Sequence, residues 1–282
     1  MPLLSAYACA VPAIMATRTI ESKRDRMATI LIAPFMTCSA RLPVYTMFIA
    51  AFVPSRPLLG FLFGTRAAAM LALYLLGFLM AIATARLLKA SVLKSRNAPF
   101  MMEMPPYRWP TLHSLALRLL DRTKAFVYRA GTVILGVTVV LWALTSLPLH
   151  HGQAPALQDS LVAKLGHVIE PVIAPLGFDW KIGVGLITSL AARETIIATL
   201  GTLYGVDPAS HAMDLQAALR HDLTPAAAVA LLVFFAFAMQ CMSTIAIVRR
   251  ETNGWTWPVL QFTYMTGVAY VSAFLAYRLF QL

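Results

Sequence analysis

Long apolar runs dominate the hydrophobic pattern of this 282-residue chain, and polar residues are concentrated between them. A helix that crosses a membrane needs about 20 mostly apolar residues. Residues 58–85, 126–147 and 257–280 reach that length without interruption, so each is predicted to form a continuous span. Because lipid offers no hydrogen bonds to the main chain, these spans should be helices, and the sequence predicts an all-α polytopic membrane protein.

Three further apolar runs, residues 27–53, 182–204 and 225–248, each contain a polar interruption near the middle. The interruptions read TCSARLP at residues 37–43, ARET at residues 192–195 and QCMST at residues 240–244. Main chain that leaves the helix at mid-membrane depth is tolerated only where it faces protein or a water-filled path. We therefore expect broken helices whose interruptions face a functional site.

Charged residues are scarce and mostly basic. They make up 12% of the chain, about half the share in a soluble globular protein, and the formal net charge is +11. The basic excess falls in residues 17–26 and 86–129, which predicts that both are cytoplasmic, whereas the net acidic stretches 149–181 and 205–224 are predicted to be external. With both of its flanks external, segment 182–204 should enter the membrane and return as a re-entrant hairpin.

The same order of segments occurs twice along the chain. A short piece around Cys9 precedes the first broken span, the re-entrant hairpin precedes the second, and a continuous span follows each. The loop charges make the two broken spans cross in opposite directions, which is the inverted repeat of many secondary transporters. We divide the chain into a first repeat truncated at its N-terminus, a basic cytoplasmic linker with an amphipathic helix, a linking span with an external amphipathic segment, and a second repeat: residues 1–85, 86–125, 126–181 and 182–282.

All three cysteines, Cys9, Cys38 and Cys241, fall at or beside an interruption. A thiolate binds borderline and soft divalent metals, and unwound helix ends offer carbonyl oxygens that complete a weak, exchangeable shell. Alternatively, the cysteines are small apolar residues that pack where helices approach closely. The absence of a CxxC pair excludes a zinc ribbon and a disulfide scaffold.

Arg193 and Glu194 lie within an apolar run, where ionisable residues are functional candidates by default. They are expected to form a gate element or, alternatively, an internal ion pair or an arginine that snorkels toward an interface. The group Arg249, Arg250 and Glu251 is expected to anchor the cytoplasmic end of its span. Weaker pathway candidates are the thioethers and hydroxyls beside the breaks, which in helices more often fill the core: Met36, Ser39, Met239, Met242 and Ser243.

Several signatures of other functions are missing from the sequence. No HExxH occurs, so a zinc membrane protease lacks its metal pair, and no GxxxxGK[ST] or GxGxxG occurs, so nucleotide hydrolysis by this chain is not expected. The basic linker has no interleaved aromatic platform and is not expected to bind nucleic acid.

The stretches at the breaks resemble the membrane part of the ferrous-iron transporter B (FeoB) family. They are CAVPAIMATR at 9–18, APFMTCSARLPVY at 33–45, MEMPPYR at 102–108, LAARE at 190–194 and QCMSTIAIVRRE at 240–251. The resemblance implies two gate repeats that move Fe²⁺, as transported substrate, inward across the bacterial inner membrane, with no tightly bound cofactor. It also implies that Cys9, Cys38 and Cys241 are the metal ligands.

The chain departs from that family because it contains no GTPase domain. We therefore expect that it is not an enzyme by itself and that it depends on a GTPase-bearing partner or on a missing N-terminal half, with a homo-oligomer also open. One alternative is a non-transporting membrane subunit or remnant of a split transporter. Another is a gate-domain carrier of a different solute such as a nucleoside, although the breaks offer thiols and hydroxyls rather than a cluster of amides and carboxylates.

Overall fold

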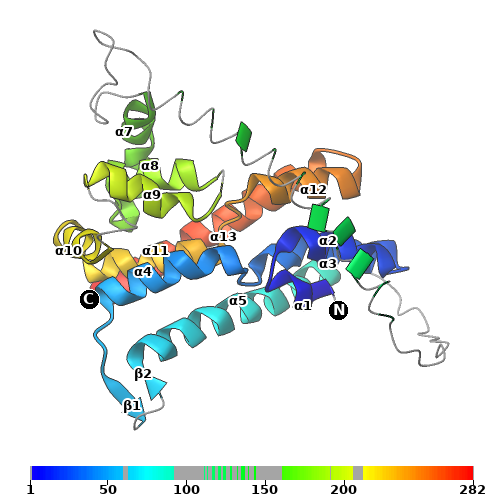
Figure 1. Cartoon of the computed structure of the whole chain (residues 1–282), viewed down its shortest axis with the longest axis horizontal. Helices are drawn as coiled ribbons and strands as arrows, with labels where there is room; N and C mark the ends of the chain where they lie inside the picture. The colour runs from blue at the N-terminus through cyan, green and yellow to red at the C-terminus, as the bar shows by residue number, and fades with distance from the viewer. Residues whose placement is uncertain are drawn as a thin grey trace.

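The computed structural model describes residues 2–59, 63–91, 161–190, 192–205 and 212–281, together with isolated positions between 111 and 143. These residues are largely helical (Figure 1), which confirms the all-α prediction. Within the described ranges, four helical segments are long and apolar enough to cross a bilayer, so the chain is a multi-pass membrane protein. They are Lys23–Phe52, Thr65–Ala90, Pro225–Thr252 and Thr256–Gln281.

The first broken span consists of helices separated by short 3₁₀ turns. Pro34 has no N–H, so the carbonyl of Ile30 loses its helical partner four residues later, and the side chain of Gln261 donates to it at 3.1 Å instead. Pro43 lies in the first turn of the helix that follows the break. The elements of this half are α1 (Pro2–Ala6), α2 (Ala10–Ala16), η1 (Thr17–Thr19), α3 (Lys23–Ile32), η2 (Ala33–Phe35), η3 (Ser39–Arg41), α4 (Leu42–Phe52) and α5 (Thr65–Ala90).

The second half contains the predicted hairpin, because two short helices fold back on one another. Lys181, in the first turn of α8, lies 4.3 Å from the ring centre of Tyr204, which ends α9, so both ends of the segment meet. The elements are α7 (Leu161–Ile173), η5 (Ala174–Leu176), α8 (Trp180–Ser189), α9 (Thr195–Leu203), α10 (Ala212–Asp222), α11 (Pro225–Phe237), α12 (Met242–Thr252) and α13 (Thr256–Gln281).

The two breaks are held by equivalent contacts. Figure 1 shows that the first broken span, α3 to α4, and the second, α11 to α12, run in opposite directions. The N–H of Ser39 donates to the carbonyl of Ala8 at 3.4 Å, and the N–H of Met242 donates to the carbonyl of Leu190 at 3.1 Å. Each donor directly follows the cysteine of its break, and each acceptor lies between the two short helices that precede that break. The repeated order read from the sequence is thus matched by repeated contacts.

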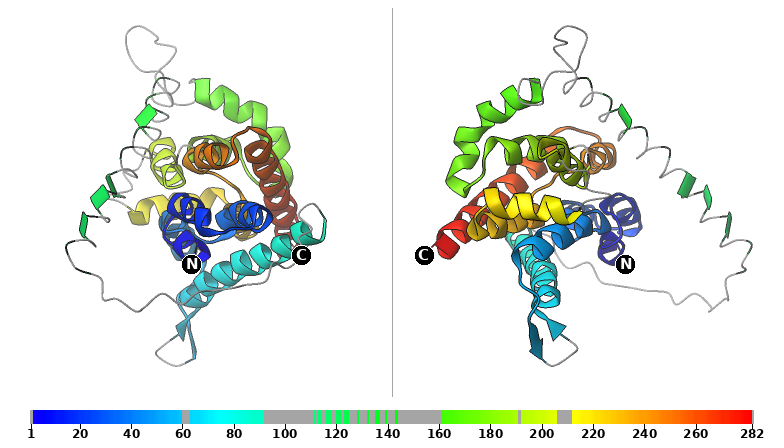
Figure 2. Two further views of the ribbon diagram at one scale, coloured as in Figure 1. Left: turned by 90° about the vertical axis from the view of Figure 1, so that its right-hand side faces the viewer. Right: turned by 60° about the vertical axis from the view of Figure 1, so that its left-hand side comes forward.

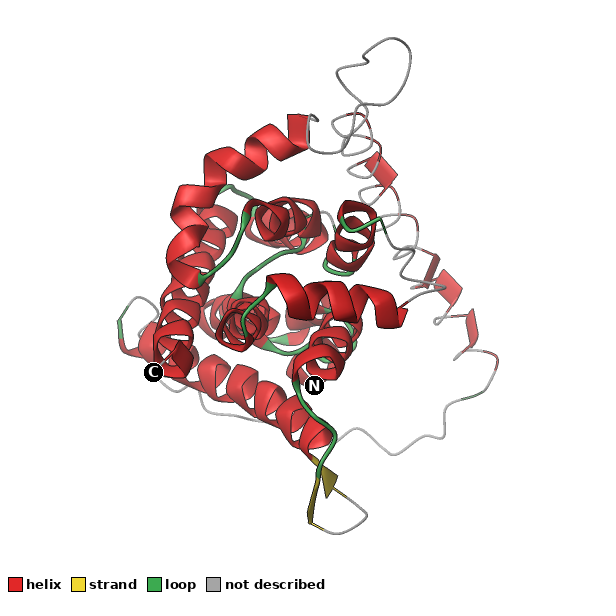
Figure 3. Ribbon diagram, turned by 90° about the vertical axis from the view of Figure 1, so that its left-hand side faces the viewer, coloured by secondary structure: helices red, strands yellow, loops and turns green. Residues whose placement is uncertain are grey.

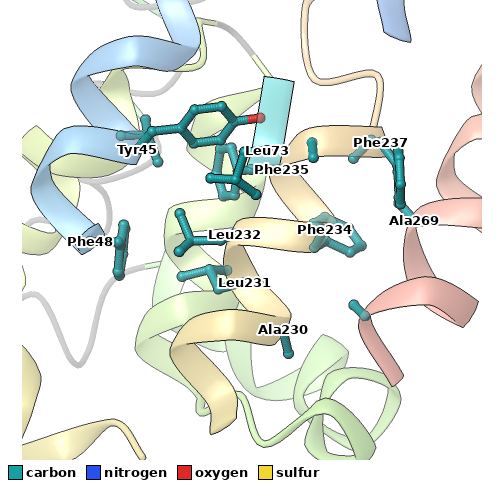
Figure 4. Close-up of a cluster of buried hydrophobic side chains, with 14 of the residues drawn as sticks. Tyr45, Phe48, Leu73, Ala230, Leu231, Leu232, Phe234, Phe235, Phe237 and Ala269 are labelled. Carbon is teal, nitrogen blue, oxygen red and sulfur yellow. The ribbon is translucent and has the colours of Figure 1, made fainter. Parts of the chain in front are cut away.

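The apolar core is built around α11. Figure 4 shows its residues from Ala230 to Phe237 directed toward Tyr45 and Phe48 of α4, Leu73 of α5 and Ala269 of α13. Loop segments lie among the helices in the end-on view of Figure 3, and α5 runs along the outside of the group in Figure 2. Helices α5 and α13 keep large apolar side chains exposed, as expected of faces that contact lipid: Leu71, Leu75, Leu79, Val271 and Leu275.

One predicted span is wrong in its bounds. Residues 58–85 were expected to form it, but α5 begins at Thr65 and ends at Ala90. Strand β1 (Pro57–Leu59) pairs antiparallel with β2 (Phe63–Gly64), and the Thr65 hydroxyl donates to the carbonyl of Pro54, which closes the connection before the helix starts. Of the predicted span 126–147 and the amphipathic linker helix, only isolated positions are described. The division into four segments stays a prediction.

Candidate functional site

A cavity of about 220 Å³ lies where the breaks meet. All three cysteines line it: Cys38 and Cys241 from the two breaks, and Cys9 from the turn between α1 and α2. Most of the weaker candidates line it too, but Met239 is buried in the apolar core and Met242 lies outside the cavity. The predicted residues that the structure brings together here are Cys9, Cys38, Cys241, Met36, Ser39, Arg193, Glu194 and Ser243.

Each cysteine occupies the position at which the chain enters a helix after a break. Cys9 precedes α2 and Cys241 precedes α12, and both have extended main chain, with φ of −157° and −155°. Cys38 precedes η3 in the same way. All three are free thiols and half-buried. Each cysteine is the residue directly before a helix, and the helix fixes the position of its main chain. The thiols are therefore held in place by the helices that follow the breaks.

The thiols share a cavity without forming a closed metal site. Within the described residues, no three side chains among histidine, cysteine, aspartate and glutamate are grouped closely enough to hold a metal ion. Besides the cysteines, the cavity offers the carboxylate of Glu194 and the hydroxyls of Ser39, Ser243 and Thr244. The donors are therefore a mixture of soft sulfur and hard oxygen.

Arg41 is the functional candidate that the sequence left without a role. Its side chain is fully buried, and its guanidinium donates to three carbonyls of its own break, those of Pro34 at 2.9 Å and of Phe35 and Met36 at 3.3 Å. These carbonyls have no helical partners because the helix has ended, and a cation at a helix C-terminus also stabilises the helix dipole. The sequence feature that could have identified Arg41 is its position inside a polar interruption of an apolar run.

Arg193 does the same for the second break, from a different element. Its side chain is 5% exposed and donates to the carbonyls of Phe235 at 3.3 Å and Ala238 at 3.0 Å, at the C-terminal end of α11. The alternative of an internal ion pair with Glu194 is wrong, because Arg193 donates to main chain and Glu194 is exposed at the cavity wall. Each break therefore has a buried guanidinium on its carbonyl groups.

Two models of known protein families match parts of the chain. The family model described as "Nucleoside recognition" (Gate) matches residues 1–52 and 127–255, which is more than half of the chain. The chain therefore belongs to the Gate family of proteins. A second model, "Ferrous iron transport protein B C terminus", matches residues 70–122, so this part of the chain is similar to the C-terminal part of FeoB.

Curated relatives agree over the whole chain. It is 44% identical over 301 residues to the Fe(2+) transporter FeoB of Leptospira interrogans serovar copenhageni, with 100% of this chain and 43% of the relative covered. It is 39% identical to that of Leptospira biflexa, over 99% of this chain and 42% of the relative. It is 35% identical to an Fe(2+) transport protein A/Fe(2+) transporter FeoB fusion protein of Porphyromonas gingivalis, over 99% of this chain and 37% of the relative. The chain thus spans about two fifths of these relatives, and no solved structure matches it.

Proposed function

We propose that the chain forms the membrane pathway of a FeoB-type ferrous-iron transporter in the bacterial inner membrane. The observation that carries the proposal is the single cavity, between oppositely directed broken spans, that Cys9, Cys38 and Cys241 line together. Binding sites of transporters with inverted repeats are expected where broken elements meet. The curated relatives, named Fe(2+) transporters, support the choice of cargo.

Cys38 and Cys241 are the paired ligands of this proposal, since they occupy equivalent positions in the two breaks, and Cys9 is the third. Fe²⁺ is a borderline cation that accepts both thiolate and carboxylate ligands. A thiol must lose its proton to bind the ion, so each thiol that binds releases one proton, and each thiolate that the ion leaves takes up one proton again. Three thiols that share a cavity without a closed site suit an ion that has to leave again.

Arg193 and Glu194 form the gate element of this proposal. The guanidinium of Arg193 attaches the tip of the hairpin to the end of α11, while Glu194, the next residue, faces the cavity. A movement of the hairpin relative to α11 would break these hydrogen bonds and carry the carboxylate toward or away from the thiols. The position of one pair of residues would thereby set both the shape and the charge of the cavity.

Energy coupling is assigned to a part other than this chain. The chain covers 37% to 43% of the relatives' lengths and contains no phosphate-binding motif. We therefore propose that it is not an enzyme by itself and that GTP hydrolysis is supplied by a GTPase-bearing partner or by the remainder of a longer protein. The fusion of Fe(2+) transport protein A to FeoB in Porphyromonas gingivalis makes a protein like transport protein A a further candidate partner.

A nucleoside carrier is the second candidate, since the Gate model is described as "Nucleoside recognition". The cavity argues against it in two ways. Pockets that enclose drug-sized molecules measure roughly 300–1,000 Å³, and this one measures about 220 Å³. Its polar side chains are thiols, hydroxyls, the carboxylate of Glu194 and the guanidinium of Arg193, without the side-chain amides that would satisfy a ribose and a base.

The test is uptake of ⁵⁵Fe²⁺ by an iron-transport-deficient bacterium that carries this chain with or without the N-terminal part of a FeoB relative. Uptake that requires both parts would support the proposal, provided that immunoblotting shows the chain inserted in the membrane. Absence of uptake with both parts inserted would contradict it. Uptake of a radiolabelled nucleoside, without uptake of iron, would favour the second candidate.

A further inference from the structure

Helices α2 and α12 pack against one another directly beside the cavity. Their first turns form part of its wall, since Cys9 and Val11 belong to the start of α2 and Cys241 and Thr244 to the start of α12. Both helices lead away from the cavity. The interface between them therefore leads directly from the thiols toward the opposite ends of α2 and α12.

Apolar side chains fill that route one to two turns beyond the cysteines. Ile14 of α2 packs with Ile247 and Val248 of α12 in one buried cluster, which Ile30 and Ala33 complete from the first broken span. These residues are between 0% and 6% exposed. A hydrated cation cannot cross such a layer while the two helices are in contact, because its water or ligands would be lost without replacement.

An ion-pair clamp lies beyond the apolar layer. Glu251, in the last turn of α12, accepts hydrogen bonds from Arg18 at 2.5 Å and from Arg26 at 2.6 Å. Arg18 follows α2 and Arg26 belongs to α3, so the carboxylate joins three elements. The Glu251 side chain is 2% exposed, whereas those of Arg18 and Arg26 are 57% and 31% exposed. The loss of either arginine would leave a buried carboxylate with fewer partners.

The length of the sealed route fits half a membrane. Ten residues separate Cys241 from Glu251, which at 1.5 Å per residue is about 15 Å of helix, against a hydrocarbon core of about 30 Å. The basic residues around the clamp, including Arg249 and Arg250, place its outer end in the cytoplasm by the positive-inside rule. The cavity then lies near the middle of the bilayer, and the contact between α2 and α12 closes its cytoplasmic side.

We propose that the interface between α2 and α12 is the exit through which the cation leaves the cysteine-lined cavity, and that Glu251, held by Arg18 and Arg26, keeps it closed. Release requires α2 and α12 to separate, which breaks the clamp and opens the apolar layer. The identity of the cargo rests on the proposed function, but the location of the exit does not. Glu251 is thus a gating residue that acts through the helices and not a ligand of the cavity.

The test is the rate at which a membrane-impermeant methanethiosulfonate reagent labels Cys9 and Cys241 in the full chain from each face of oriented membrane vesicles, with mass spectrometry to locate the label. Glu251→Gln keeps the size of the side chain and removes its charge. We expect it to raise labelling from the cytoplasmic face at least about tenfold and to leave labelling from the external face unchanged. Arg250→Gln, on the exposed side of the same turn, is the matched control and should change neither rate.

Cytoplasmic labelling of Glu251→Gln at the rate of the unsubstituted chain would overturn the proposal. Equal gains from both faces would indicate loss of the fold, and Arg18→Gln, which alters a side chain that is 57% exposed, then decides: it should raise labelling from the cytoplasmic face alone, and no change would again overturn the proposal. Faster cytoplasmic labelling without any iron uptake would leave the exit in place and contradict the cargo. Iron uptake by the unsubstituted chain, with unchanged cytoplasmic labelling of Glu251→Gln, would support the cargo and overturn the proposed exit.

Discussion

The guanidinium of Arg193 lies 3.0 Å from the carbonyl oxygen of Ala238, and this bond joins the tip of the α8–α9 hairpin to the end of α11. Arg41 makes the equivalent bonds to the first break from within its own span. The two halves therefore solve one problem, unsatisfied carbonyls inside a membrane, with the same chemical group placed at different positions in the repeat. Since the arginines occupy carbonyls at both breaks, the side chains around the cavity become the main ligands available to a cation.

Arg41 should contribute far more to stability than Arg66, an exposed arginine that also donates to main-chain carbonyls. Arg41→Ala leaves the carbonyls of Pro34, Phe35 and Met36 buried without donors and is expected to cost roughly 3 kcal/mol or more. Arg66→Ala is the control, since that exposed arginine also donates to carbonyls at a helix end, those of Val53 and Ala50, which water can reach. It should cost about 1 kcal/mol or less. Thermal unfolding in detergent measures both, and equal losses would contradict the role of Arg41.

Gly77 sets how closely α5 approaches the first break. A Cβ atom at this position would lie 2.8 Å from the carbonyl oxygen of Phe35, so Gly77→Ala should push α5 away and cost roughly 1–3 kcal/mol, with loss of transport. Gly267 in α13 has open space around it, and Gly267→Ala should stabilise the helix by about 0.5–1 kcal/mol. A Gly77→Ala chain that unfolds at or above the temperature of the unsubstituted chain would show that the close approach is not required.

The contact between Lys181, at the start of α8, and Asp222, at the end of α10, should make the stability of the chain sensitive to acid. Hydrogen bonds from Lys181, at 2.7 Å, and then from His221 lower the pKa of Asp222 to about 2. Since an unfolded aspartate titrates near 4, this carboxylate contributes stability that is complete above about pH 5 and is lost as the pH falls from about 4 to about 2. Asp222→Asn should lower the unfolding temperature at pH 6 and match the unsubstituted chain near pH 2. A deficit of equal size at both pH values would contradict this assignment.

The polar interruptions could be read from the sequence because each is a local pattern of several residues within an apolar run. That pattern located the breaks before Cys38 and Cys241 and the hairpin tip at Arg193, and it predicted that these residues share one site. Their meeting in one cavity agrees with that prediction, whereas metal binding by the thiols stays a prediction.

Other features depend on contacts that no local pattern contains. Gln261 replaces the donor that Pro34 removes, although it lies 231 residues from its acceptor Ile30. Glu251 and Arg18 lie 233 residues apart, so their clamp could not be inferred from either segment. The pairing of Pro57–Leu59 with Phe63–Gly64 was missed because apolar residues there extended the run and concealed where the helix begins.

The central claim is that the thiols of the two breaks carry the cation, and ⁵⁵Fe²⁺ uptake by cysteine variants, co-produced with the N-terminal part of a FeoB relative, tests it most directly. Cys38→Ser and Cys241→Ser should each reduce uptake at least about tenfold, the loss expected when one ligand contributes about 1.4 kcal/mol. Met242→Leu, which removes a soft sulfur outside the cavity, should leave uptake unchanged. Uptake by both serine variants equal to that of the unsubstituted chain would contradict the account.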